Sequence, residues 1–178
     1  TLTAFLRSVQ ITVTSAVTSG GSNPQNLRVA GAGISVTPTS ASPSRPSTSG
    51  VQTNSTGQVT VQLPPGAYEV DVDGNTASPA HLDVDNSSLT VPVTTSTATI
   101  AKPIEIQETR IRGSVTVDDG EGAATTTDVL VALDGPGANN PSDTFALNSS
   151  GVAAYELFVS AATYDMTVSV EGSTDHTE

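Results

Sequence analysis

A hairpin-like pattern occurs twice in this chain. In the first copy, a polar turn at residues 54–57 (NSTG) leads into alternating apolar residues, a corner at residues 64–66 (PPG) and a second alternating run that opens with Tyr68. In the second copy, the turn is residues 148–151 (NSSG) and the second run opens with Tyr164. Because side chains alternate between the two faces of a strand, each copy predicts a β-hairpin with one buried face. The sequence therefore predicts two copies of a small all-β unit.

The surroundings of the first hairpin extend the pattern. The run NSTGQVTVQLPPGAYEVDVDG is preceded by GAGISVTPT, and residues 33–74 together resemble the carboxypeptidase regulatory-like repeat. The second copy carries residues 160–163 (SAAT) where the first has residues 64–66. The resemblance implies two tandem Ig-like or transthyretin-like β-sandwich domains in an accessory or extracellular module. It brings no catalytic residues to carry over.

Length and spacing predict where the two domains lie. The copies are offset by roughly 95 residues, which suits two sandwiches of ordinary size. We place the first β-sandwich at residues 1–105 and the second at residues 106–178. With 3% aromatic residues and no tryptophan, their cores must be built from Val, Ile, Leu and Ala. β-Branched residues among these favour pleated sheets over helices.

The second domain is predicted to be incomplete. Further strands follow Tyr68 at residues 89–93 and 98–100, whereas little sequence follows the equivalent run after Tyr164. A sandwich that lacks strands has an open sheet edge, which another chain can cover by pairing. Either the alternating run at residues 9–13 or the leading segment, residues 2–6, could supply such a strand. We therefore expect a homo- or hetero-multimer formed by edge-strand pairing.

The charge balance excludes one class of partner. The chain has 18 acidic against 6 basic residues, a net charge of −12, and Lys102 is its only lysine. Nucleic-acid binding needs clustered Lys and Arg, so no nucleic-acid partner is expected. No stretch reaches the length of a membrane span, and residues 1–14 show no secretion signal. Cysteine is absent, so no disulfide holds either domain.

Catalytic motifs are missing from the sequence. His81 and His176 are the only histidines, and neither has a neighbour at metal-ligand spacing. We interpret both as exposed loop residues. The nucleophile motif G-x-S-x-G does not occur. We therefore expect that the chain is not an enzyme and that it needs no cofactor.

One acidic cluster is a weak candidate for calcium. Asp71 and Asp73 lie two apart on one predicted strand, and Asp83 and Asp85 repeat that spacing after a short loop. Oxygen ligands from neighbouring loops are what Ca²⁺ prefers. The ligand order of an EF-hand is absent, and a solvated outer face explains the same residues more simply. We therefore expect no metal.

The turns give residue-level expectations. Gly57 and Gly66 should be turn residues, Gly66 with a positive φ, and Tyr68 should pack under the corner. Gly151 and Tyr164 should play the same parts in the second domain.

Three glycosylation sequons fall in predicted turns or loops, at Asn54, Asn86 and Asn148. They agree with an exterior location, although chains rich in Ser, Thr and Asn contain such matches by chance.

These features favour a non-catalytic structural protein on the exterior of a particle or cell. It would be a subunit of a surface fibre or appendage, or a decoration or spike protein of a virion. The alternative is an adhesin or carbohydrate-binding module of a larger exported protein. Sugar rings usually stack on aromatic platforms, and most aromatic residues here fall within predicted strands.

Overall fold

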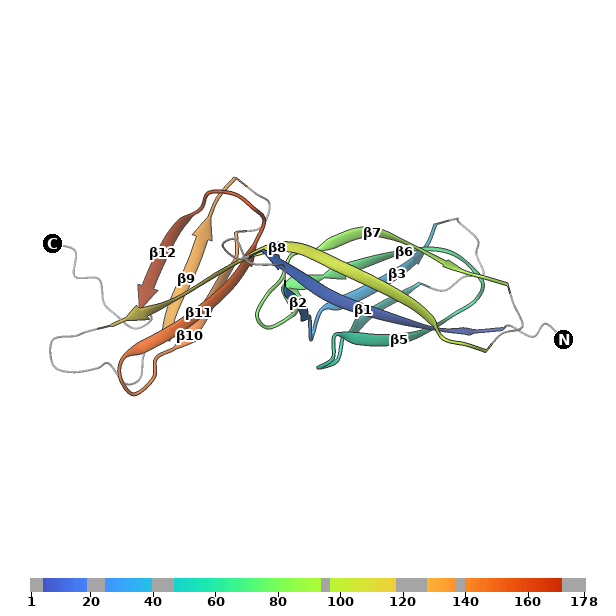
Figure 1. Ribbon diagram of the computed structural model, residues 1–178, viewed down its shortest axis with the longest axis horizontal. Helices are drawn as coiled ribbons and strands as arrows, with labels where there is room; N and C mark the ends of the chain where they lie inside the picture. The colour runs from blue at the N-terminus through green and yellow to red at the C-terminus, as the bar shows by residue number, and fades with distance from the viewer. Residues whose placement is uncertain are drawn as a thin grey trace. The chain divides into compact units, whose positions relative to one another are not determined.

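The computed structural model describes residues 5–18, 25–39, 47–93, 97–117, 128–136 and 140–170. These residues are nearly all β, with twelve strands, one short 3-10 helix (Gly74–Thr76) and no α-helix. The chain divides into two compact units, Thr1–Glu108 and Thr109–Glu178. The division falls inside strand β8 (Ile100–Thr116), so one continuous strand supplies residues to both units (Figure 1).

Unit 1 is a β-sandwich of two sheets. Strand β1 pairs antiparallel with β5 along its first half and with β2 along its second half, and β8 also joins this sheet. The other sheet has the order β4-β3-β6-β7. The strands not yet bounded are β1 (Arg7–Thr18), β2 (Gln25–Arg28), β3 (Gly33–Pro38), β4 (Thr48–Gln52), β5 (Gln58–Leu63), β6 (Gly66–Asp73) and β7 (Val84–Val91).

Strands β1 and β8 run parallel. The Arg7 guanidinium donates to the Ala98 carbonyl at 2.9 Å, and seven residues further along β1 the Thr14 hydroxyl is 3.5 Å from the Ile104 carbonyl. Residue numbers therefore rise together along the two strands. The first half of β8 lies beside β1 in unit 1 (Figure 1).

The core of unit 1 lies between its sheets and follows the period-two pattern of the strands. Val9, Ile11 and Val13 of β1 are fully buried, and Ile104 and Ile106 of β8 join the same core. Burying one such side chain completely stabilises the fold by about 1.5–3 kcal/mol. Alternation on several strands therefore suffices for a core without tryptophan.

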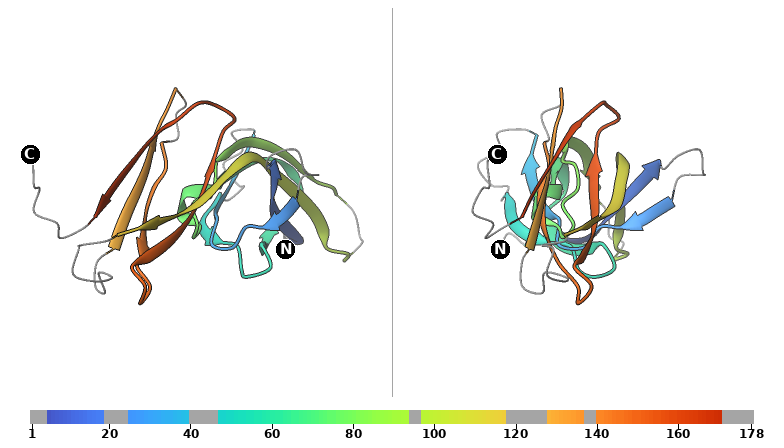
Figure 2. Two further views of the ribbon diagram at one scale, coloured as in Figure 1. Left: turned by 60° about the vertical axis from the view of Figure 1, so that its left-hand side comes forward. Right: turned by 90° about the vertical axis from the view of Figure 1, so that its left-hand side faces the viewer.

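Unit 2 is also built from two layers. The second half of β8, residues 109–116, pairs antiparallel with β11. The other sheet has the order β10-β9-β12 (Figure 2). Val129, Val131 and Leu133 of β9 form the centre of its core together with Leu157 of β11. The strand bounds are β9 (Asp128–Asp134), β10 (Ser142–Ala146), β11 (Val152–Val159) and β12 (Asp165–Val170).

The repeated turn has the same hydrogen bonds in both units. The Asn54 side-chain oxygen accepts from the amides of Thr56 and Gln58, and that of Asn148 accepts from the amides of Ser150 and Val152. The glycine that closes the turn also makes a matching contact with the neighbouring strand. The Val13 amide donates to the Gly57 carbonyl at 2.8 Å, and the Val117 amide donates to the Gly151 carbonyl at 2.9 Å. The second half of β8 is thus the counterpart of β1.

Candidate functional site

Two apolar side chains on β12 of unit 2 are exposed although they point to the inner face of their sheet. Met166 lies directly opposite Leu133 and Val168 directly opposite Val131 in the β9–β12 pairing, and both partners are buried. Residues directly opposite each other on antiparallel strands point to the same face. Met166 and Val168 therefore point to the inner face of the sheet, yet they are 49% and 39% exposed.

The equivalent side chains of unit 1 are buried. The Tyr68 hydroxyl donates to the carbonyl of Pro64, and the Tyr164 hydroxyl donates to the carbonyl of Ser160, four residues upstream in each unit. Because the two tyrosines are equivalent, Met166, two residues after Tyr164, corresponds to Val70, two residues after Tyr68. By the same offset Val168 corresponds to Val72, and both valines of unit 1 are buried completely or almost so.

Two strands explain the difference. In unit 1, β7 pairs with β6 and adds Leu89 and Val91 to the core, while the first half of β8 adds Ile104 and Ile106. Among the described residues of unit 2, no strand takes either place. Among the strands that the structure describes, the β10-β9-β12 sheet ends at β12, and the second half of β8 pairs with β11 alone. We call the uncovered surface formed by β12 and the second half of β8 the open side of unit 2.

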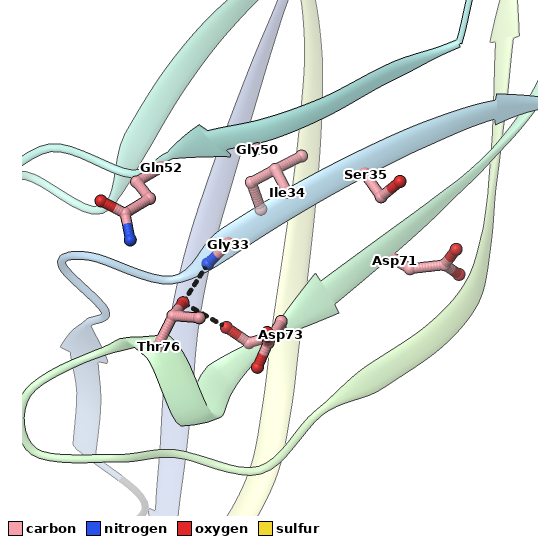
Figure 3. Close-up of a pocket in the computed structure, with 8 residues that line it drawn as sticks. All are labelled: Gly33, Ile34, Ser35, Gly50, Gln52, Asp71, Asp73 and Thr76. Atoms are coloured by element: carbon pink, nitrogen blue, oxygen red, sulfur yellow. Dashed lines mark hydrogen bonds between the residues drawn. The ribbon is translucent and has the colours of Figure 1, made fainter.

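Unit 1 carries a small pocket on the outer face of its β4-β3-β6 strands (Figure 3). Its volume is about 250 Å³, and the Thr76 hydroxyl closes one end by accepting from the Gly33 amide at 2.6 Å and donating to the Asp73 carbonyl at 2.9 Å. None of the lining residues is aromatic. They are Gly33, Ile34, Ser35, Gly50, Gln52, Asp71, Asp73 and Thr76.

The four aspartates proposed for calcium do not converge. Asp71 and Asp73 line the pocket, and the Asp71 carboxylate accepts from the Asn86 amide at 2.8 Å. The Asp83 carboxylate instead holds the loop before β7, accepting from the Gly74 amide at 2.8 Å and from the Asn75 side chain. Asp85 is exposed on β7. Within the described residues, no group of three or more His, Cys, Asp or Glu could hold a metal ion.

The interpretation of His81 as an exposed loop residue is wrong. Its ring is only 6% exposed, and its Nδ1 lies 2.6 Å from Oε1 of Glu108, whose side chain is fully buried. The other carboxylate oxygen of Glu108 accepts from the Leu82 amide at 3.1 Å. Glu108 thus ties the loop before β7 to β8. His176 lies outside the described residues.

Sequence reasoning missed this pair although a signal was present. Ile104, Ile106 and Glu108 occupy alternate positions of one strand, so the period of β8 places the Glu108 side chain on the buried face. A carboxylate on the buried face of a strand needs a buried hydrogen-bond partner. The histidine in the neighbouring loop provides one.

Among the predicted turn residues, Gly57 and Gly151 close their turns with φ of 69° each, and Tyr68 is fully buried beneath its corner. The positive φ expected at Gly66 is wrong, because Gly66 is the first residue of β6 and the positive-φ glycines of the described chain are others. Pro64 and Pro65 make the corner, so Gly66 is already extended. The corner before Tyr164 contains no glycine or proline.

The three sequon asparagines, Asn54, Asn86 and Asn148, are exposed. Asn54 and Asn148 stand in the two equivalent turns, whereas Asn86 lies within β7 with a φ of 56°. No helix among the described residues is long and apolar enough to cross a membrane.

Comparisons with known proteins give no family. No family model and no curated protein matches the chain. Among solved structures, it is similar to the Bacillus anthracis TIE protein, with a TM-score of 0.39 and 14% identity over 92% of this chain. The chain spans 29% of that protein. It is also similar to a DUF3823 family protein from Parabacteroides merdae, with a TM-score of 0.32 and 16% identity over 93% of this chain and 92% of the other.

Proposed function

We propose that this chain is a non-catalytic structural protein on the exterior of a particle or cell, built from two tandem Ig-like or transthyretin-like sandwiches. It serves as a subunit of a surface fibre or appendage, or of the outer layer of a virion. The observation that carries the proposal is the open side of unit 2. There Met166 and Val168 face the core side of their sheet and are still exposed.

Covering the open side is favourable on two counts. Burying the exposed parts of Met166 and Val168 yields on the order of 1 kcal/mol each. A strand added beside β12 or β8 also pairs backbone groups that otherwise form a free sheet edge. The net charge of −12 opposes unspecific association of whole chains, so a specific strand must provide the contact. These properties suit a subunit whose partner is another structural subunit.

The pocket of unit 1 supports the second candidate, an adhesin or carbohydrate-binding module. Asp71, Asp73 and Gln52 bring hydrogen-bonding groups for sugar hydroxyls to one small hollow. The absence of an aromatic ring among its lining residues removes the usual stacking surface. Screening the purified chain against a glycan array tests this candidate, and saturable binding lost in Asp71→Ala would favour it over the structural role.

Self-association tests the structural role. Sedimentation velocity and electron microscopy of the purified chain should show multimers that grow with concentration. Val168→Asp should weaken them, because a charge then occupies the open side. Thr90→Asp, at an exposed position of β7, is the matched control and adds the same charge to unit 1. A chain that stays monomeric at millimolar concentration would disprove the role.

A further inference from the structure

Unit 1 shows which kind of strand would cover the open side of unit 2. There the first half of β8 lies parallel to β1 and buries Ile104 and Ile106, while Glu105 and Gln107, which alternate with them, are exposed. The counterpart of β1 in unit 2 is the second half of β8. The strand that completes unit 2 should therefore be an alternating one, with apolar side chains on its inner face.

Two segments in the sequence of unit 2 lack the apolar side chains that such a strand needs. Residues 118–127 (DDGEGAATTT) and residues 171–178 (EGSTDHTE) contain no apolar side chain larger than that of alanine. Neither sequence offers a Val, Ile, Leu or Phe to place against Met166 and Val168. Neither of these two segments therefore supplies an apolar inner face.

The leading segment of the chain has the required composition. Residues 1–6 (TLTAFL) carry Leu2, Phe5 and Leu6 and no charged side chain. Phe5 and Leu6 are 71% and 55% exposed, although they directly precede β1. The other apolar run considered for this purpose, residues 9–13, is already buried in unit 1.

Strand β8 shows how one strand can serve two units. Its first half completes unit 1 beside β1, and its second half begins unit 2 as the counterpart of β1. A strand that completes unit 2 of one copy and then continues as β1 of the next copy repeats this arrangement between molecules. Residues 1–6 stand at that point of the chain.

On the basis of the proposed function, we infer that residues 1–6 of a second copy pair with the second half of β8 and cover Met166 and Val168. This contact joins different surfaces of the two copies. Repeated from copy to copy, it therefore produces an open filament, or a ring if the rotation closes. Each copy donates one segment and accepts another.

Deleting residues 1–6 is the first test. The full chain should form multimers, and the deletion should raise the dissociation constant of self-association at least tenfold. Phe5 and Leu6 are exposed, so the thermal unfolding of unit 1 should not change. Multimers of unchanged affinity after the deletion would overturn the inference and leave the proposed function standing. A full chain that is itself monomeric would overturn both.

Cross-linking then tests which surfaces meet. The chain has no cysteine, so two single-cysteine variants can form a mixed disulfide only through the introduced residues. Chains carrying Leu2→Cys or Leu6→Cys, with a mass tag, are mixed with Val168→Cys chains under mild oxidation. The mixed dimer should exceed at least tenfold that formed with Thr90→Cys chains. Equal yields with both acceptor sites would contradict the inference.

A peptide exchange experiment separates the donor segment from the chain's own tail. The deletion variant is incubated with a peptide of residues 1–8 (TLTAFLRS) or of residues 171–178 (EGSTDHTE). The first peptide should slow hydrogen exchange of the amides in the second half of β8, and the second should not. Protection by the second peptide alone would show that the chain closes unit 2 by itself.

Discussion

Val168 and Val131 lie directly across from each other on the inner face of the β9–β12 pair, yet Val131 is fully buried and Val168 is 39% exposed. The two side chains have the same chemistry and the same sheet, so the difference comes from position. Val131 is on the central strand, whereas Val168 is on the outer strand, next to places that β7 and β8 fill in unit 1. The apolar inner face of the β10-β9-β12 sheet therefore extends past the strands that pack against it.

Gly57 should tolerate no side chain. Its φ is 69°, and a Cβ there would lie 2.7 Å from the Val13 carbonyl oxygen, so Gly57→Ala combines backbone strain with a clash. We expect a loss of about 2–4 kcal/mol in the free energy of unfolding, measured by denaturant titration. Gly50→Ala is the control, because Gly50 has a φ of 74° but nothing within 4 Å of the added Cβ. Equal losses in the two variants would contradict the clash.

Glu108→Ala should destabilise unit 1 by about 3 kcal/mol, because it removes the buried carboxyl group that contacts the His81 ring and accepts from the Leu82 amide. Thermal unfolding monitored by circular dichroism provides the measurement. Glu105→Ala on the same strand removes an exposed carboxylate and should change stability by no more than about 0.5 kcal/mol. A small effect of Glu108→Ala would show that the loop before β7 is held by other contacts.

The two corner tyrosines should differ in their sensitivity to loss of the hydroxyl. Tyr68 is fully buried and donates to the Pro64 carbonyl at 2.7 Å. The half-buried Tyr164 donates to the Ser160 carbonyl at 3.2 Å and lies 2.8 Å from the Ser160 hydroxyl, in a site that water can reach. Tyr68→Phe should cost about 1–2 kcal/mol and Tyr164→Phe about 0.5 kcal/mol in chemical denaturation. The reverse order would mean that the second corner contributes more to stability than its geometry indicates.

Chelation should leave stability unchanged. Because Asp71 and Asp83 accept hydrogen bonds in different places, we expect EDTA to shift the melting temperature by no more than about 1 °C. An ion at 100 times its dissociation constant would add about 2.7 kcal/mol, which is easily detected. A loss in EDTA that Ca²⁺ restores, and that Asp71→Asn with Asp73→Asn abolishes, would establish a site after all.

The all-β character follows from the sequence because alternation is a local property. Val9, Ile11 and Val13 lie on one face of any strand they form, whatever surrounds it. The turn glycines Gly57 and Gly151 are likewise determined by short-range geometry. Gly66 shows the limit of such reasoning, because the two prolines before it already make the corner.

The buried pair could not be predicted with equal ease. Glu108 is separated from His81 by 27 positions, and their contact depends on where the loop before β7 meets β8. The exposure of Met166 and Val168 is also non-local. Their alternation predicts burial, and only a comparison of the strands that follow each tyrosine indicates that the cover is missing.

The parallel pairing of β1 with β8 also has a mechanical consequence. The chain enters unit 1 at the start of β1 and leaves it at the far end of the paired part of β8, as the contacts of Arg7 and Thr14 define. A force applied between these two points pulls the strands along each other, so the hydrogen bonds between them bear the load together instead of opening one after another. Unit 1 therefore resists stretching in shear, the geometry in which a small sheet is hardest to pull apart.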